Sequence, residues 1–167
     1  QYHGFSAEEF DSFGSDINEE DGVIHNDLFF GLKDTMIEVT VETSYYFDHN
    51  AYEWTVYFAN MGLSETKRFA NLNAADDYFY GTDASVSGVS GDYHDHYTPY
   101  KTALGHKEIV NTSGRPTHYE FPYFNLNFGG NRGVFLSVGW PGTWRANFDV
   151  CTVEGAEGAV HYTSGQY

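Results

Sequence analysis

Basic residues are scarce in this sequence. Its 167 residues include 8 Lys and Arg against 24 Asp and Glu, which gives a formal net charge of −16 at pH 7. Surfaces that bind phosphate backbones or anionic lipids need clustered positive charge, and an acidic surface repels both. The shortage of Lys and Arg therefore predicts that neither nucleic acid nor a membrane is a partner of this protein.

Cysteine and long apolar runs are also nearly missing. The single Cys151 has no second cysteine for an internal disulfide. The sequence contains no run of about 18 apolar residues that would span a bilayer, and it shows no signal-peptide pattern. Gly, Asn, Ser, Thr and Tyr are abundant, and Asn111-Thr112-Ser113 is a glycosylation sequon. Because the chain opens on Gln1, we expect an extracellular (secreted) protein whose leader has been removed, or a fragment of a longer chain.

Aromatic residues, in contrast, are plentiful. The chain has 14 Phe, 14 Tyr and 3 Trp, and 41% of its residues are hydrophobic. Disordered acidic segments lack such residues, so this chain is expected to fold, and its length suits one domain. Eight acids and no Lys or Arg occur in residues 1–32. We therefore expect an acidic N-terminal arm (1–32), either solvated or adding as a strand to a sheet, followed by a single β-sandwich domain (33–167).

Period-two alternation dominates the rest of the chain. In Thr35 to Thr43 and again in Tyr52 to Asn60, apolar and polar residues alternate as in half-buried strands. Further short aromatic or β-branched runs occur at 66–73, 107–111, 119–128, 133–139, 144–153 and 158–163. No stretch carries a helical stripe. The pattern predicts an all-β fold, an antiparallel β-sandwich.

A long polar stretch, residues 81–106, interrupts this alternation. Long loops in compact domains are more often functional than idle. Tyr93, Tyr97 and Tyr100 alternate there with Asp92 and Asp95. This composition suits a platform on which the apolar face of a sugar stacks while carboxylates meet its hydroxyls. The alternative is that these tyrosines pack down onto the sheet edges.

No other motif points to catalysis. His94-Asp95-His96 is the densest group of metal-ligand types, because residues i and i+2 of a strand share a face. The competing interpretation, a hydrophilic loop that contains two histidines, is favoured because no partner motif accompanies the pair. Paired carboxylates for glycoside hydrolysis cannot be identified from sequence. We predict no catalytic residue, no metal and no cofactor.

The most specific sequence signal lies between Arg115 and Phe148. It consists of an ordered set of short motifs: Gly114-Arg115, Pro122-Tyr123-Phe124-Asn125-Leu126, Gly129-Gly130, Gly133-Val134 and Gly139-Trp140-Pro141-Gly142-Thr143-Trp144. This set resembles the N-terminal β-domain of melibiase-like α-galactosidases and their relatives in glycoside hydrolase clan D. The runs YEWTVYFANMGLSET and GDYHDHYTPY are similar to further segments of that domain.

The resemblance implies a galactose-mutarotase-like or supersandwich type of β-sandwich in compact form. It also implies that catalysis belongs elsewhere, because those enzymes use two aspartates of a barrel that follows the β-domain. The present sequence ends at Tyr167, before any such barrel. Trp140 and Trp144 match the motif that supplies rim aromatics to the sugar site in some members.

Together these observations predict a non-catalytic, carbohydrate-associated domain of an extracellular protein. Its expected partners are carbohydrate, copies of itself or a following catalytic domain. The alternatives are a structural subunit that uses its acidic arm for strand addition to a neighbour, and a fragment of a longer glycoside hydrolase. The expected sugar-binding residues are Trp140, Trp144, Tyr93, Tyr97, Asp92 and Arg115.

Overall fold

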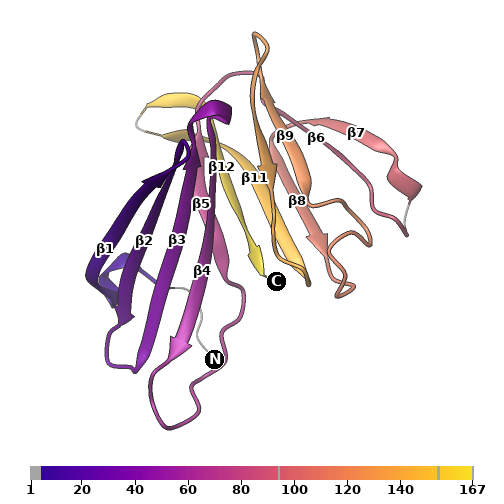
Figure 1. Ribbon diagram of the computed structural model, residues 1–167. Coiled ribbons are helices and arrows are strands. Elements are labelled where there is room, and N and C mark those ends of the chain that lie inside the picture. Colours follow the sequence, from indigo (N-terminus) through magenta and orange to yellow (C-terminus); the bar gives the residue numbers. More distant parts are fainter. Residues whose placement is uncertain (1–4, 94, 154, 167) are drawn as a thin grey trace. The chain divides into compact units, whose positions relative to one another are not determined.

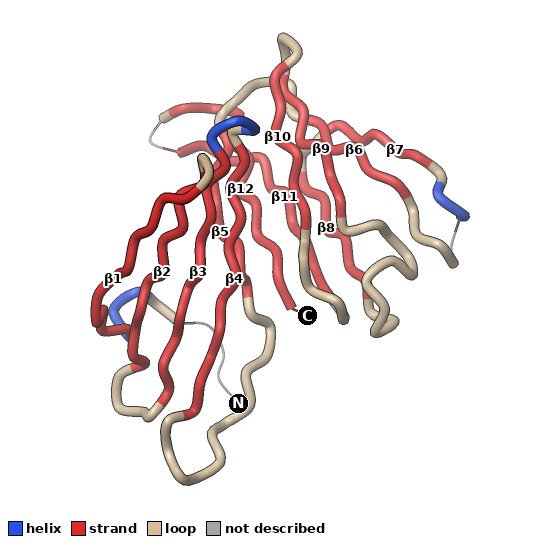
Figure 2. The backbone as a smooth tube through the Cα atoms, viewed as in Figure 1, coloured by secondary structure: helices blue, strands red, loops and turns tan. Residues whose placement is uncertain are grey.

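A computed structural model describes residues 5–93, 95–153 and 155–166 of the chain (Figure 1). These residues form strands joined by turns and three short 3₁₀ helices (Figure 2). No helix in the described ranges is long and apolar enough to cross a membrane. The chain divides into two compact units, Gln1–Phe69 and Ala70–Tyr167.

The first unit is a four-stranded antiparallel meander in the order β1-β2-β3-β4. Its elements are η1 (Ala7–Glu9), β1 (Phe10–Glu20), β2 (Val23–Leu32), β3 (Ile37–Tyr46), η2 (Phe47–His49) and β4 (Ala51–Asn60). The buried side chains on one face of this sheet are Leu32, Ile37 and Val39. Phenylalanines from both ends of the unit, including Phe5 and Phe69, pack against them.

The acidic segment 1–32, expected either to be solvated or to add as a strand to a sheet, follows the second alternative from Phe10 onward. Residues Phe10 to Leu32 form the β1–β2 hairpin, and β2 pairs with β3 along its whole length. The hairpin turns at Asp21 and Gly22, which have φ values of 51° and 79°. Two positive φ values at an Asp-Gly pair are the signature of a two-residue type I′ turn. The expected boundary between residues 32 and 33 lies inside the first compact unit, at the end of β2.

The second unit contains two four-stranded antiparallel sheets, in the orders β10-β9-β6-β7 and β5-β12-β11-β8. Its strands are β5 (Asn73–Phe79), β6 (Ser85–Val89), β7 (Pro99–Ala103), β8 (His106–Asn111), β9 (Tyr123–Phe128), β10 (Arg132–Ser137), β11 (Trp144–Val153) and β12 (Ala156–Gln166), with η3 at Asp95–Tyr97. The two sheets pack through Phe124 of β9, whose ring centroid lies 5.7 Å from Trp144 and 5.6 Å from Phe148 of β11. All three rings are fully buried.

The predicted all-β class and the antiparallel sandwich are confirmed. Two local expectations were wrong. The strand expected at 66–73 is not formed over 66–72, because β5 begins at Asn73, and the stretch 81–106 contains β6 and β7. β6 escapes a search for alternating apolar residues because its fully buried Val86 is followed at the next inner position by Gly88. A Cβ at Gly88 would lie 2.5 Å from the hydroxyl oxygen of Tyr100 directly opposite, so only glycine leaves room for that ring.

Candidate functional site

The structure brings Asp92 and Arg115 together from different loops. The Nη1 atom of Arg115 lies 3.3 Å from Oδ2 of Asp92, and its Nη2 atom donates to Oδ1 at 3.4 Å. This two-pronged geometry is the one in which a planar guanidinium best matches a carboxylate. Both side chains remain open to solvent, 56% exposed for Arg115 and 29% for Asp92. Sequence analysis selected both residues without predicting their contact.

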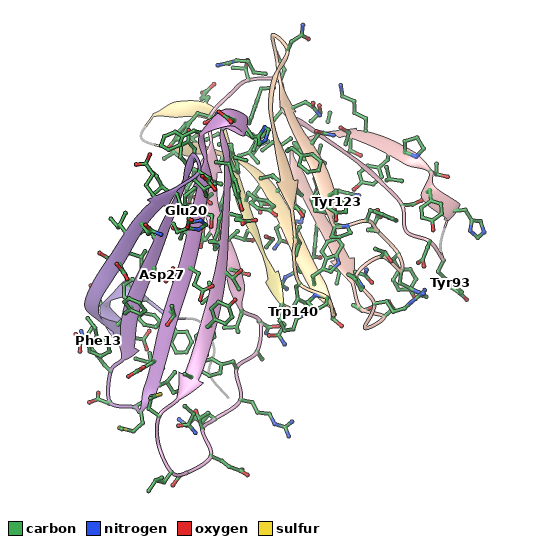
Figure 3. All side chains as sticks on the ribbon, in the orientation of Figure 1. Phe13, Glu20, Asp27, Tyr93, Tyr123 and Trp140 are labelled. Carbon is green, nitrogen blue, oxygen red and sulfur yellow. The ribbon has the colours of Figure 1, made fainter. Side chains whose placement is uncertain are left out.

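An aromatic stack lies beside this ion pair. The ring of Tyr93 stacks on His118 with a centroid distance of 4.3 Å and an interplanar angle of 12°. Arg115 Nη2 donates to Nδ1 of the same histidine at 2.6 Å, which fixes the imidazole next to the guanidinium. His118 was not predicted as a site residue. We name Asp92, Tyr93, Arg115 and His118 the polar cluster; Tyr93 marks its position in Figure 3.

Backbone pairing holds the polar cluster in place. The amide of Asp92 donates to the Thr117 carbonyl at 2.9 Å, and the amide of Tyr93 donates to the His118 carbonyl at 3.1 Å. Gly91 makes this approach possible, because a Cβ there would lie 2.3 Å from the carbonyl oxygen of Thr117. The two loops therefore act as one rigid support for Tyr93 and Asp92.

Tyr97 comes from a strained segment. Asp95, His96 and Tyr97 all have positive φ values, 57°, 46° and 65°. Non-glycine residues adopt this conformation at a cost of about 1–3 kcal/mol, and such strain gathers at functional sites. The Tyr97 ring is 55% exposed and meets the Phe121 ring edge-on at 5.6 Å. His94 of the predicted His94–His96 pair lies outside the described residues. Within the described ranges, no three His, Cys, Asp or Glu side chains are grouped to hold a metal ion.

The two tryptophans of the Gly-Trp motif have opposite environments. Trp144 is fully buried between the sheets, and its Nε1 donates to the Pro116 carbonyl at 2.8 Å. It therefore presents no face to a sugar, and its expected role at a rim is not compatible with this placement. Trp140 is 43% exposed in the turn after β10 and lies against Gly142, where a Cβ would be 2.8 Å from its Nε1.

Asn111 of the glycosylation sequon is also inside the protein. It is fully buried at the end of β8, and its Oδ1 accepts a hydrogen bond from the Ser113 hydroxyl. A glycan attached at its Nδ2 atom has no path to solvent in the folded chain. The sequon is therefore better explained as a structural element of the Asn111–Arg115 turn.

Sequence reasoning missed a row of outward-facing rings. Phe121 and Tyr123 lie two positions apart in extended chain, and their rings are 6.2 Å apart. Tyr123 of β9 in turn stacks on Phe135 of β10 at 6.0 Å and 16°. The i, i+2 alternation of Tyr119, Phe121 and Tyr123 was visible in the sequence. This alternation predicts a strand, but the sequence does not tell which face of a strand is solvent-exposed.

No family model matches this chain, and no curated protein matches it. Solved structures do match. The GH36 α-galactosidase AgaA from Geobacillus stearothermophilus in complex with stachyose superposes with a TM-score of 0.71 at 14% identity, over 95% of this chain and 24% of that one. The α-galactosidase from Lactobacillus brevis gives 0.70 at 10% identity. The galactosidase domain of the α-galactosidase-sucrose kinase AgaSK gives 0.71 at 12%, and both cover the same shares of the two chains.

This likeness confirms, at the level of fold, the resemblance predicted from the sequence. The chain spans about a quarter of the length of its structural neighbours. That coverage is consistent with a β-sandwich domain without a catalytic barrel.

Proposed function

We propose that this chain is a non-catalytic carbohydrate-binding domain, extracellular in location, whose polar cluster binds α-galactosides. The observation that carries the proposal is the Arg115–Asp92 ion pair placed beside the Tyr93–His118 stack. Small-ligand sites combine flat apolar surface with a few fixed polar groups that orient the ligand. The exposed face of Tyr93 offers that surface, and the ion pair offers adjacent donors and acceptors for neighbouring hydroxyls.

The choice of α-galactosides comes from the structural neighbours. AgaA variants have been crystallised with stachyose and with raffinose, both of which carry α-linked galactose. The acidic surface of the present chain favours such neutral sugars over anionic ones. Trp140 is a second expected carbohydrate contact, apart from the polar cluster, because Val138 donates to the Pro122 carbonyl and so starts the Trp140 turn next to the Tyr123 segment; Figure 3 shows Trp140 and Tyr93 well apart.

The alternative of a self-assembling subunit with a free acidic arm is not favoured. Within the arm, β1 already pairs with β2 on one side, and β1 carries four carboxylates, Asp11, Asp16, Glu19 and Glu20. Like charges along an edge strand oppose pairing with a second copy of the same strand.

Calorimetric titration of the full chain with raffinose and stachyose tests the proposal. The wild type is expected to bind both sugars, and Arg115→Ala and Tyr93→Ala are expected to reduce the affinity by about tenfold or more, the equivalent of about 1.4 kcal/mol. Arg68→Ala, which removes an exposed arginine from the other unit, is the matched control and should bind as the wild type does. If neither sugar gives a heat of binding in the calorimeter or a chemical-shift change in an NMR titration, the α-galactoside proposal is rejected.

A further inference from the structure

Four aromatic side chains continue from the loop of the polar cluster onto the outward face of the β10-β9-β6-β7 sheet. We name them the aromatic strip: Tyr97, Phe121, Tyr123 and Phe135. Each ring contacts the next, with centroid distances of 5.6, 6.2 and 6.0 Å in that order. Tyr97, Tyr123 and Phe135 are 55%, 47% and 62% exposed. Phe121 is half-buried. Three exposed rings connected through it differ from the singly scattered hydrophobic side chains of an ordinary surface.

Amide and hydroxyl groups accompany the strip. Asn125 lies directly opposite Phe135 on one side and Ser87 on the other. On the same face, Asn127 Nδ2 donates to the Ser87 hydroxyl at 3.1 Å, and Lys101 lies opposite Ser87 on β7. These groups are neutral or positive, and they offer both donors and acceptors beside the rings.

Carboxylates are missing from this sheet. The strands β6, β7, β9 and β10 contain no Asp or Glu, although the chain has 24 of them. A basic protein partner would therefore find its counter-charges elsewhere on the molecule. A hydroxyl-rich, uncharged ligand finds rings for its apolar faces and amides for its hydroxyls, with no carboxylate competing for the amide donors.

We propose that the aromatic strip binds a single extended chain of a neutral polysaccharide and that the polar cluster takes an α-galactosyl group carried by that chain. This inference rests on the proposed carbohydrate-binding function and extends it from one sugar to several consecutive ones. Binding along a row of linked subsites raises affinity with ligand length, because each added contact is intramolecular.

The angles between neighbouring ring planes favour a soluble polysaccharide chain over a crystalline polysaccharide surface as the ligand. Neighbouring rings differ by 16° between Phe135 and Tyr123, by 36° between Tyr123 and Phe121, and by 69° between Phe121 and Tyr97. The planes of Phe135 and Tyr123 are thus nearly parallel, and the ring planes turn away from that orientation toward Tyr97. The flat surface of a crystalline polymer cannot contact all four rings, whereas a soluble chain that twists about its axis can follow them.

Affinity electrophoresis in gels containing soluble galactomannan, combined with titration of stachyose, tests this inference on the full chain. We expect Tyr123→Ala and Phe135→Ala to weaken galactomannan binding by about tenfold and to leave stachyose binding unchanged. Arg115→Ala should weaken both. Tyr57→Ala, which removes an exposed tyrosine from β4 of the other unit, should change neither. Thermal melting checks the folding of each variant, and Tyr123→Leu replaces Tyr123→Ala if that variant is unstable.

The outcomes separate the two proposals. If the protein binds stachyose but binds galactomannan no more tightly, the strip proposal is overturned while the proposed function stands. The same holds if Tyr123→Ala does not change the affinity for galactomannan. Galactomannan binding that depends on Tyr123, without any stachyose binding, supports the strip and rejects the α-galactoside site. Failure of both ligands rejects both proposals.

Two further measurements address other occupants of the strip. Sedimentation with insoluble crystalline cellulose is expected to leave the protein in solution, and sedimentation that requires Tyr123 would overturn the soluble-chain assignment. Light scattering is expected to give the same mass for wild type and Tyr123→Ala. A loss of mass in the variant, with galactomannan binding unchanged, would make the strip an interface between copies of this chain and overturn the proposal.

Discussion

The two units of this chain differ in how they arrange some of their carboxylates, although the first unit also contains an ion pair, between Lys33 Nζ and Asp11 Oδ1 at 3.5 Å. In the first unit, Asp16, Asp27 and Glu42 lie directly opposite one another on three neighbouring strands, so that three like charges form a row. In the second unit, carboxylates have basic partners. Asp92 pairs with Arg115 and Asp76 with His161 at 2.7 Å, and Asp149 pairs with His106.

The difference shows where the net charge acts. Like charges directly opposite one another across a sheet destabilise it. The row of three carboxylates therefore lowers the stability of the first unit. A face with such a row repels anions and other copies of itself. The second unit keeps its β6, β7, β9 and β10 strands free of acids and exposes rings there. The net charge of −16 is therefore unevenly distributed. The sheet face with the row of carboxylates repels anions, whereas the β10-β9-β6-β7 sheet suits a neutral ligand.

The largest expected effect distinguishes the inside of the second unit from its outward face. Trp144→Ala removes a fully buried indole together with its hydrogen bond to Pro116, and it should lower the free energy of unfolding by about 3–5 kcal/mol. Tyr123→Ala, on the outward face of the same unit, should cost about 0.5 kcal/mol or less. Urea denaturation followed by circular dichroism measures both. Equal losses would show that the strip is part of the core.

A smaller effect tests the carboxylate row. Asp27→Asn removes the middle charge while keeping the shape of the side chain, and it should raise the free energy of unfolding by about 0.2–1 kcal/mol at low salt. The gain should shrink at high salt, because ions screen the repulsion. Glu65→Gln, in the exposed loop after β4, is the control and should be neutral at both salt concentrations. A gain that does not depend on salt would contradict the electrostatic explanation.

The smallest effect concerns the paired carboxylates. A hydrogen bond with Asp149, together with the charge of that carboxylate, raises the pKa of His106 above its usual value. A raised folded-state pKa contributes stability that is fully present below the unfolded pKa of about 6.5 and is lost as pH rises through the folded value. His106→Gln should therefore lower Tm at pH about 5.5 and leave it unchanged at pH about 8.5.

His49→Gln, in η2 of the first unit, is the matched control for the loss of an exposed imidazole. The same small change at both pH values in His106→Gln would show that the pair with Asp149 contributes by packing and not by charge. A larger loss at the higher pH would reverse the sign and reject the raised pKa.

Local patterns in the sequence predicted part of this structure. Alternation over Thr35 to Thr43 and Tyr52 to Asn60 identified β3 and β4, because period two fixes which side chains share a face of a strand. The Asp21-Gly22 pair is itself a sequence signal for a hairpin turn. The many acidic residues around it instead favoured an acidic arm as the interpretation of this segment. Gly88 and the neighbouring serines made β6 difficult to recognise, because they interrupt the apolar alternation that begins with the fully buried Val86, and the Tyr100 ring fills the space beside Gly88.

The candidate site depended on contacts that no local pattern contains. Asp92 and Arg115 are 23 residues apart, and their pairing follows from the hydrogen bonds between the loop at 91–93 and the segment at 117–119. His118 and Phe135 become site residues only because Tyr93 and Tyr123 lie beside them. Composition made carbohydrate a reasonable expectation, but it could not choose among 31 aromatic side chains.

The sequence by itself determined the strand class, the acidic and aromatic balance and the Gly-Trp turn, because these depend on residue type and short-range spacing. The tertiary structure decided which rings face solvent. Trp140 and Trp144 lie four positions apart in one motif, yet one is 43% exposed and the other fully buried. The reason is physical. Trp144 belongs to β11, where cross-strand register directs its side chain between two sheets, whereas Trp140 stands in the turn before it, where no partner strand fixes a face.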